Sequence, residues 1–486
     1  MRRAGILLHP TSLPSPGPIG DLGPMAHRFV DWLAEAGCSI WQLLPLNPTG
    51  PGYCPYASPS AFACEPRLIS LELLAADGLL HKDELADRPP AGSAIGGPAV
   101  EAWKLPRLHL AADRLAAAEP DALAEYTAEE PWAADWALFA ALSEVHASGW
   151  WGWPDAGLRH RDPDALAQAR AQLKPQVDRH LALQVIFDRQ WAALKERASR
   201  SGVEIIGDIP IFVSGEGADT WAHRDLFRMD ADGNLAVKAG VPPDYFSPTG
   251  QLWGNPHYDW PAHAATGFAW WKARFDRVMR HCHRVRVDHF RGFAAAWAVP
   301  ADAETAIDGA WSPGPGRALF DAVGDLPLIA EDLGVITPDV EALRDDIGAP
   351  GMKILQFGFG DTADHPFLPH NYTRRCVVYT GTHDNDTSRG WYDTAPEPAR
   401  HRFRVYAARD GADVSWDLIR LAWASVADDA IAPMQDVLSL GSEARMNVPG
   451  EVDGNWIWRM SGIPDHTAQR LRGLAWAYGR LPPEAP

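Results

Sequence analysis

The sequence is poor in cysteine and contains no long hydrophobic run. Its 5 cysteines are an odd number without paired spacing, which is typical of free thiols in a reducing compartment. No stretch approaches the roughly 18 apolar residues that a membrane-spanning helix needs. The apolar run after Met1 is too short for the core of a signal peptide. These absences predict a cytoplasmic protein that does not bind a membrane.

Basic charge is also scarce. The 486 residues include 44 Lys and Arg against 63 Asp and Glu, which gives a formal net charge of −19. Nucleic acids and anionic membranes attract basic protein surfaces, so this balance argues against both as partners. A hydrophobic share of 46% with 22% charged residues is ordinary for a globular protein.

Motifs for phosphate, serine-nucleophile and metal chemistry are missing or weak. There is no Walker sequence and no Gly-x-Ser-x-Gly, and the isolated Gly-x-Gly pieces at 215–217 and 358–360 are too short to indicate a phosphate site. His281, Cys282 and His283 suggest zinc, but in a strand Cys282 points away from both histidines, so the three cannot easily close a tetrahedron. We therefore expect no metal and no cofactor.

The chain does contain an alternation of short apolar strands and helical patterns. Largely apolar strands favour a parallel sheet that is covered on both faces. Eight of them with helices between predict an α/β fold, a (β/α)8 TIM barrel that forms one catalytic domain over residues 1–486. The predicted strands, counted to the carboxylate where they end in one, are 5–8, 39–46, 203–210, 283–288, 328–331, 352–357, 377–384 and 432–438.

Two insertions interrupt this alternation. The segment 68–200, between the second and third predicted strands, has a mostly helical pattern, with helices expected at 105–118, 132–147 and 166–199. The segment 212–266, between the third and fourth strands, is aromatic and is predicted to be loop-rich.

Four of the predicted strands end in a carboxylate. Asp208, Asp288, Glu331 and Asp384 belong to the third, fourth, fifth and seventh strands. The carboxyl ends of the strands form the active face of a (β/α)8 barrel. We therefore expect the four side chains to converge on one pocket. Each alone would be interpreted as a structural ion pair, but their convergence favours catalysis.

Converging carboxylates without a metal motif are typical of glycoside chemistry. A retaining mechanism uses an ionised carboxylate as nucleophile and a protonated carboxyl as acid, about 5–5.5 Å apart. Asp288 lies between Arg286 and Arg291, and Arg286 shares its face of the strand, which favours the ionised form. Glu331 follows apolar residues, which favours the protonated form. Asp384 is suited to hold sugar hydroxyls, and the 22 tryptophans offer flat faces for sugar rings.

These residues lie in segments that resemble the 4-α-glucanotransferases, also called amylomaltases or disproportionating enzymes, of glycoside hydrolase family 77. The matches span nearly the whole chain, and their number and order make the resemblance specific. They are HPTSLP at 9–14, GDIPIFV at 207–213, GVPPDYFS at 240–247, GQLWGNP at 250–256, RVDHFRG at 286–292, EDLG at 331–334, THDND at 382–386 and EARMNVPG at 443–450.

The resemblance implies transfer between maltooligosaccharides or other α-1,4-glucans. Asp288 would form a covalent glycosyl ester, Glu331 would protonate the leaving sugar and then deprotonate the acceptor, and Asp384 would hold hydroxyls of the transferred sugar. The resemblance also implies substrate-binding residues. These are Arg286, His383 and Asp208 at the donor subsite, Tyr56, Trp253 and Asn447 along the groove, and Tyr245 and Phe246 on a mobile loop over the cleft.

Two other functions stay open at this point. An α-glucan hydrolase of the α-amylase clan would use the same three carboxylates with freer access of water. A non-catalytic glucan-binding protein is disfavoured because all three carboxylates are present. The chain also departs from the family, which usually has serine at the position of Cys54 and Gly-Asn where Cys64 and Glu65 stand. Because a thiol is a weaker hydrogen-bonding group than a hydroxyl, Cys54 is not assigned to substrate binding.

Overall fold

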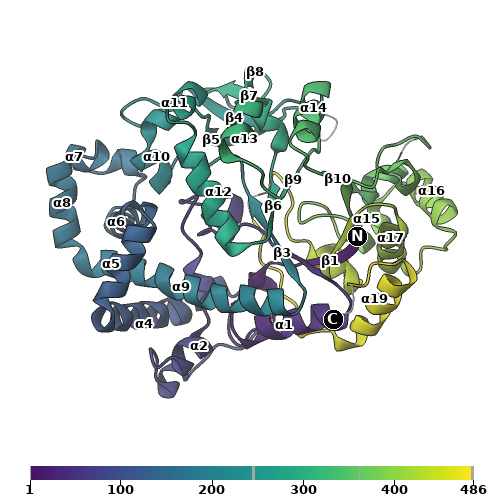
Figure 1. Ribbon diagram of the computed structural model, residues 1–486, viewed down its shortest axis with the longest axis horizontal. Helices are drawn as coiled ribbons and strands as arrows, with labels where there is room; N and C mark the ends of the chain where they lie inside the picture. Colours follow the sequence, from purple (N-terminus) through teal and green to yellow (C-terminus); the bar gives the residue numbers. More distant parts are fainter. Residues whose placement is uncertain (1, 244–246, 361, 452, 483–486) are drawn as a thin grey trace.

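A closed barrel of eight parallel strands forms the centre of the molecule (Figure 1). In this computed structural model, residues 2–243, 247–360, 362–451 and 453–482 are described. The strands follow one another around the barrel in chain order, and each is parallel to its neighbours. The predicted (β/α)8 fold is therefore confirmed. The barrel strands are β1 (Arg3–Leu7), β2 (Ile40–Gln42), β3 (Glu204–Ile209), β6 (Arg284–Val287), β9 (Leu328–Ala330), β10 (Gly351–Ile354), β11 (Cys376–Tyr379) and β12 (Asp429–Pro433).

The last barrel strand is displaced from its predicted position. β12 ends at Pro433, and the next four residues form helix α18 (Met434–Val437). Proline has no N–H for a further ladder bond, which is consistent with the strand ending there. The prediction of a strand at 432–438 was wrong because a short apolar run has no period that separates strand from helix.

Helices on the outside cover the barrel. The first, α1, has Pro24 in its first turn, buries Phe29, Val30 and Leu33, and is followed by Gly37 with a positive φ of 71°. The helices of this layer and of the loops near it are α1 (Pro24–Glu35), α10 (Ala218–Ala222), α11 (Trp260–Ala265), α12 (Ala269–His281), α13 (Arg317–Val323), α14 (Pro338–Asp346), α15 (Ser388–Thr394), α16 (Glu397–Ala407), α17 (Val414–Ala424) and α19 (Asp465–Ala477).

Between β2 and β3 the chain forms a group of helices at one side of the barrel, on the left in Figure 1. The helix expected at 166–199 is two helices, because Pro175 lies in the first turn of a new helix that begins after Leu173. The second of these, α9, packs against α4, α5 and α6 and also against α1 of the barrel layer. The helices are α2 (Leu71–Ala76), α3 (Gly97–Ala99), α4 (Leu105–Ala118), α5 (Pro120–Glu129), α6 (Trp132–Val145), α7 (Ala156–Arg159), α8 (Pro163–Gln172) and α9 (Lys174–Arg200).

A second, antiparallel sheet lies outside the barrel, at the top of Figure 1. Its strand order is β5 (Gln251–Pro256), β4 (Val237–Val241), β7 (Ala295–Pro300) and β8 (Ala310–Pro313). The segment 212–266 was predicted to be loop-rich, but it contributes two of these strands. β4 pairs with β7, and β7 pairs with β8. Both β7 and β8 come from a later connection, between β6 and β9, and this non-local pairing has no signature in either segment alone.

Tryptophan serves the core more than the surface. Trp32, Trp41 and Trp271 are fully buried, whereas Trp253 and Trp311 remain 39% and 40% exposed. The abundance of tryptophan is therefore weaker evidence for sugar binding than its exposure at particular positions. Within the described ranges, no helix is both long and apolar enough to cross a membrane. All five cysteines are unpaired.

Candidate active site

The carboxyl ends of the barrel strands carry all four predicted carboxylates. Asp208 is the next-to-last residue of β3, Asp288 and Glu331 directly follow β6 and β9, and Asp384 lies five residues after the end of β11. The sheet register places Asp208 directly beside Arg286 of the neighbouring strand. Residues that are far apart in the sequence therefore meet at one end of the barrel.

Arg286 links two of these carboxylates. Its Nη1 atom lies 2.7 Å from Asp208 Oδ2, and its Nη2 atom lies 2.9 Å from Asp288 Oδ1. Burial alone would lower the pKa of the guanidinium, but the charges of Asp208 and Asp288 outweigh this and raise it well above the ordinary value. A buried, permanent cation thus faces Asp288, whose side chain stays 28% exposed toward the pocket.

Asp208 is buried beneath the pocket. Tyr56 donates its hydroxyl hydrogen to Asp208 Oδ2 at 2.9 Å, and the Tyr56 ring stacks on the imidazole of His383 at 5.1 Å between centroids. Asp208 Oδ1 has no hydrogen-bond partner among the described residues. Burial raises the pKa of Asp208 to about 6, although the charge of Arg286 opposes the shift.

Glu331 is held by two backbone N–H groups. His289 donates to Glu331 Oε2 at 2.6 Å, and Leu333 donates to Glu331 Oε1 at 3.1 Å. Desolvation by the surrounding protein raises the pKa of Glu331 well above the ordinary carboxyl value. Arg286 opposes this shift, and the charge of Asp288 adds to it. This environment favours the protonated form of the carboxyl.

Asp384 has the opposite environment. His383 Nε2 lies 3.2 Å from its Oδ2 atom, Asn447 donates to Oδ1 at 2.6 Å, and Arg445 donates to its backbone carbonyl at 2.6 Å. Desolvation alone would raise its pKa, but the charge and hydrogen bond of His383 and the hydrogen bond of Asn447 lower it well below the usual value. Arg445 had no predicted role, although it lies in the segment 443–450 that carries the resemblance.

Arg291, the second arginine near Asp288 in the sequence, makes its contacts elsewhere. Its guanidinium donates to the carbonyl oxygens of Ala295 and Val335 and lies 3.7 Å from the ring centroid of Trp311. Arg291 therefore connects the segment after β6 to the loop after β9. Gly292 belongs to the same turn, and an added Cβ would come within 2.6 Å of the Ile211 side chain.

The predicted groove residues are distributed around this centre. Tyr56, His383 and Asn447 contact the carboxylates as described above, and Trp253 lies on β5 with its ring edge-on to His289 at 4.8 Å. Tyr245 and Phe246 fall outside the described residues. Cys54 is half-buried, and desolvation raises the pKa of its thiol, with added contributions from the charges of Asp384 and Asp288. The thiol is therefore close enough to both carboxylates to sense their charge.

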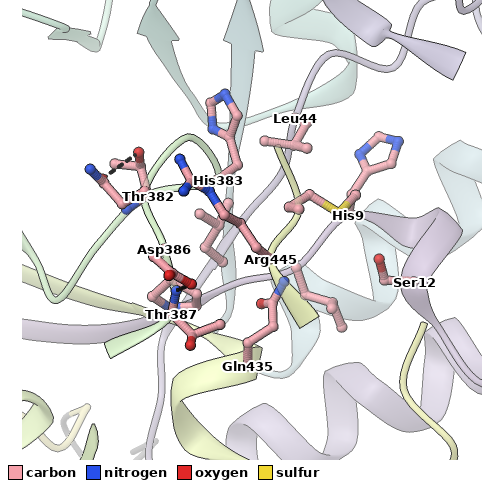
Figure 2. Close-up of a pocket in the computed structure, with 14 residues that line it drawn as sticks. His9, Ser12, Leu44, Thr382, His383, Asp386, Thr387, Gln435 and Arg445 are labelled. Atoms are coloured by element: carbon pink, nitrogen blue, oxygen red, sulfur yellow. Dashed lines mark hydrogen bonds between the residues drawn. The ribbon is translucent and has the colours of Figure 1, made fainter. Parts of the chain in front are cut away.

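A small cavity of about 30 Å³ is lined in part by His383 (Figure 2). Its lining includes His9, Leu44, Gln435 and Arg445, and it contains neither Asp288 nor Glu331. The volume suits about two water molecules rather than a sugar ring.

One cluster within the described residues has metal-ligating side chains close together. Ligand atoms of Cys64, Asp188 and His281 all lie within 4.8 Å of one another. Arg277 already contacts Asp188 at 2.7 Å and Cys64 at 3.6 Å. His281 turns Nε2 toward Asp188 and Nδ1 toward Cys64. Zinc usually has four ligands in a tetrahedron, but this cluster offers three. Asp188 and Cys64 lie on opposite nitrogens of the His281 ring, and the Arg277 guanidinium already occupies the cluster. The cluster therefore does not suit zinc.

Comparison with known proteins places this geometry in a family. A family model described as 4-alpha-glucanotransferase matches residues 8–465. The chain belongs to this family. A 4-alpha-glucanotransferase from Thermus thermophilus is 47% identical over 501 aligned positions, which cover 99% of each chain. One from Solanum tuberosum, described as chloroplastic/amyloplastic, is 45% identical over 99% of this chain and 87% of its own length.

Solved structures agree with the assignment to the 4-alpha-glucanotransferase family. The amylomaltase from Streptococcus agalactiae in complex with acarbose has a TM-score of 0.96 at 36% identity, and the match covers 99% of this chain and 100% of that one. An amylomaltase from Corynebacterium glutamicum, at 20% identity and a TM-score of 0.78, shares the fold.

Proposed function

We propose that the protein is a 4-α-glucanotransferase that moves α-1,4-glucan segments between maltooligosaccharides with retention of configuration. The contrast between Asp288 and Glu331 carries this proposal. Asp288 is paired with the Arg286 guanidinium at 2.9 Å, whereas the pKa of Glu331 is raised well above the ordinary carboxyl value. An ionised carboxylate beside a protonated one is what a retaining double displacement needs.

In the first step, an Asp288 carboxylate oxygen attacks the anomeric carbon of the donor. The glycosidic C–O bond breaks, and Glu331 gives its proton to the leaving oxygen. In the second step, the 4-hydroxyl of an acceptor sugar attacks the same carbon, and Glu331 takes the hydroxyl proton. The ester bond breaks with its electrons returning to Asp288. One glycosidic bond replaces another, so no cofactor is consumed.

The remaining predicted residues would bind the sugar chains. Asp384, with its carboxylate fixed by His383 and Asn447, would accept hydrogen bonds from hydroxyls of the transferred sugar. Arg286 and Asp208 would complete the donor subsite from below. Tyr56 and Trp253 would offer ring faces along the groove, and Tyr245 and Phe246 would lie on the segment between β4 and β5. A covered site would keep water from competing with the acceptor.

Incubation with maltotriose tests the proposed transfer. A ladder of longer maltooligosaccharides together with glucose is the expected product. An α-glucan hydrolase of the α-amylase clan, the alternative function, would give maltose and glucose without longer products. Unchanged maltotriose would indicate a protein that binds glucans without acting on them.

Asp288→Asn tests the nucleophile. We expect transfer to fall by several orders of magnitude while the thermal unfolding curve stays close to that of the wild type, because the amide keeps the shape but cannot form the ester. The matched control is Asp230→Asn, in an exposed turn, which should retain full activity. Near-normal transfer by Asp288→Asn would remove this residue from the nucleophile role.

We further propose that the protein works in the cytoplasm. Its five unpaired cysteines, four of them buried, are compatible with a reducing compartment.

A further inference from the structure

His289, the residue after the proposed nucleophile, holds the proposed acid. Its backbone is left-handed, with φ 48° and ψ 50°, a conformation that is uncommon for residues other than glycine and asparagine. In this conformation the His289 N–H points at Glu331 Oε2 at 2.6 Å, and the next N–H, of Phe290, donates to the Glu331 carbonyl at 3.1 Å. The turn therefore fixes both the side chain and the backbone of Glu331.

The second sheet contacts this turn from both of its edges. On edge strand β5, the Trp253 ring meets the His289 ring at 4.8 Å with an interplanar angle of 86°. On the opposite edge strand, β8, the Trp311 ring lies under the Arg291 guanidinium. Arg291 also donates to the Val335 carbonyl, in the loop that follows Glu331. The sheet is thus linked to Glu331 through His289 and to the loop after Glu331 through Arg291.

The His289 side chain that contacts Trp253 is uncharged. Burial lowers the pKa of its imidazole to about 3, so the ring is neutral wherever the enzyme would operate. Its Nε2 atom has no hydrogen-bond partner among the described residues. The ring does contact the Trp253 ring edge-on, which is a favoured geometry for two aromatic rings.

We propose that Trp253 and His289 act as positioning residues for Glu331. A sugar on the exposed face of Trp253 would fix the indole, the indole would fix the His289 ring, and the His289 N–H would hold the carboxyl that transfers the proton. Occupancy of this groove position would then raise the rate of the chemical step as well as the affinity. This inference rests on the proposed transferase function and on Glu331 as the acid.

The kinetic signature separates positioning from binding. A sugar platform that only binds would raise KM when truncated and leave kcat unchanged. We expect Trp253→Ala to lower kcat on maltotriose about tenfold to hundredfold, and Trp253→Phe to recover most of the loss. His289→Asn should lower kcat to a similar extent, because asparagine accepts the left-handed backbone but does not reach Trp253.

The pH profile gives a second readout. Glu331 is faced by Arg286 and Asp288 from the β6 end and by Asp332 from its own loop. All three charges remain in the variants. The His289 N–H stabilises ionised Glu331 and so lowers its pKa. Neither variant removes this N–H, but a less firmly held turn would lengthen the hydrogen bond, so the alkaline limb of kcat/KM should move to higher pH in Trp253→Ala and in His289→Asn.

A double variant tests whether the two residues act together. Trp253→Ala with His289→Asn should be no slower than the slower single variant, because residues that act through one contact are not additive. Trp476→Ala, a change at a 75% exposed tryptophan on α19, serves as the control and should leave kcat and the pH profile unchanged. Thermal unfolding of each variant separates loss of fold from loss of positioning.

Two results would overturn the inference while the wild type still produces the maltooligosaccharide ladder. One is a rise in KM for Trp253→Ala with kcat and the alkaline limb unchanged. The other is a double variant whose loss equals the product of the two single losses. A wild-type protein that makes no longer products from maltotriose would instead contradict the proposed function.

Discussion

Glu331 follows β9 directly, Asp384 lies five residues after β11, and the two carboxyls differ in the direction of their pKa shifts. Desolvation raises the pKa of both carboxyls, yet Asp384 ends well below and Glu331 well above the ordinary value. The difference lies in their partners. Asp384 receives hydrogen bonds from the side chains of His383 and Asn447, whereas Glu331 receives two backbone N–H bonds and faces the negative charge of Asp288. Partners rather than desolvation alone therefore decide which carboxyl holds a proton.

Substitution of Glu331 by a residue that cannot give up a proton should lower the rate more than any other change in this comparison. Glu331→Gln is expected to lower kcat for maltotriose by roughly 10²-fold to 10⁴-fold, the usual contribution of a general acid. A donor with fluoride as leaving group should recover formation of the glycosyl ester, because fluoride departs without full protonation. Equal losses on maltotriose and on the fluoride donor would contradict the acid role.

The Asp384 position should respond differently to the same chemical change. Asp384→Asn is expected to lower kcat/KM for both donors by about 10²-fold to 10³-fold, since it removes a charge that stabilises the transition state rather than a proton. The fluoride donor should give no recovery. If the Asp384→Asn variant regained activity on the fluoride donor alone, proton transfer would be assigned to Asp384 instead of Glu331.

The partners of Asp384 can be weakened without changing the carboxylate. Asn447→Ala removes the donor at 2.6 Å from Oδ1 and is expected to lower kcat/KM about tenfold, in the range for a hydrogen bond to a charged group. The acid limb of kcat/KM should move to higher pH, because the ionised form of Asp384 loses a donor. Asn234→Ala, in an exposed turn, is the control and should change neither quantity.

Stability should show the smallest effects, with opposite signs. A raised folded pKa gives stability below the unfolded value, about 4.3 for Glu, that is lost as pH rises through the folded value. Glu331→Gln should therefore raise Tm at pH 8 relative to the wild type. A lowered folded pKa gives stability above the unfolded value, about 3.9 for Asp, so Asp384→Asn should lower Tm at pH 7 and the difference should close in acid.

The shifts in Tm are expected to stay within about 2 °C, because the Asp384 side chain is 41% exposed and solvent weakens its interactions. Differential scanning calorimetry from pH 3 to pH 8 would measure them. Shifts of the same sign in both variants at pH 7 to 8 would contradict the opposite environments of the two carboxyls.

The fold and the centre of the site could be predicted from local patterns. Strands that end in Asp288, Glu331 and Asp384 are visible in the sequence, and the shared strand face of Arg286 and Asp288 follows from the alternation of side chains. The ion pair between Arg286 and Asp208 could not be predicted, because it depends on the register of β3 beside β6.

Features that depend on distant pairing were missed for the same reason. β4 and β5 are short strands whose sheet is completed by β7, from another part of the chain. Arg291 is adjacent to the site in sequence, but the turn sends its guanidinium toward Trp311 instead. Arg445 reaches Asp384 across 61 positions of sequence, a contact with no local pattern.

The departure at Cys54 gives the protein a natural chemical probe. Of its five thiols, four are buried, and the half-buried one is close enough to Asp384 and Asp288 for their charges to raise its pKa. A thiol-specific reagent should therefore label one position on the folded chain, slowly at neutral pH because the thiol pKa is raised, and faster in alkali. Slower labelling in the presence of maltotriose would place Cys54 beside the bound sugar, in an unmodified sequence and without a coupled assay.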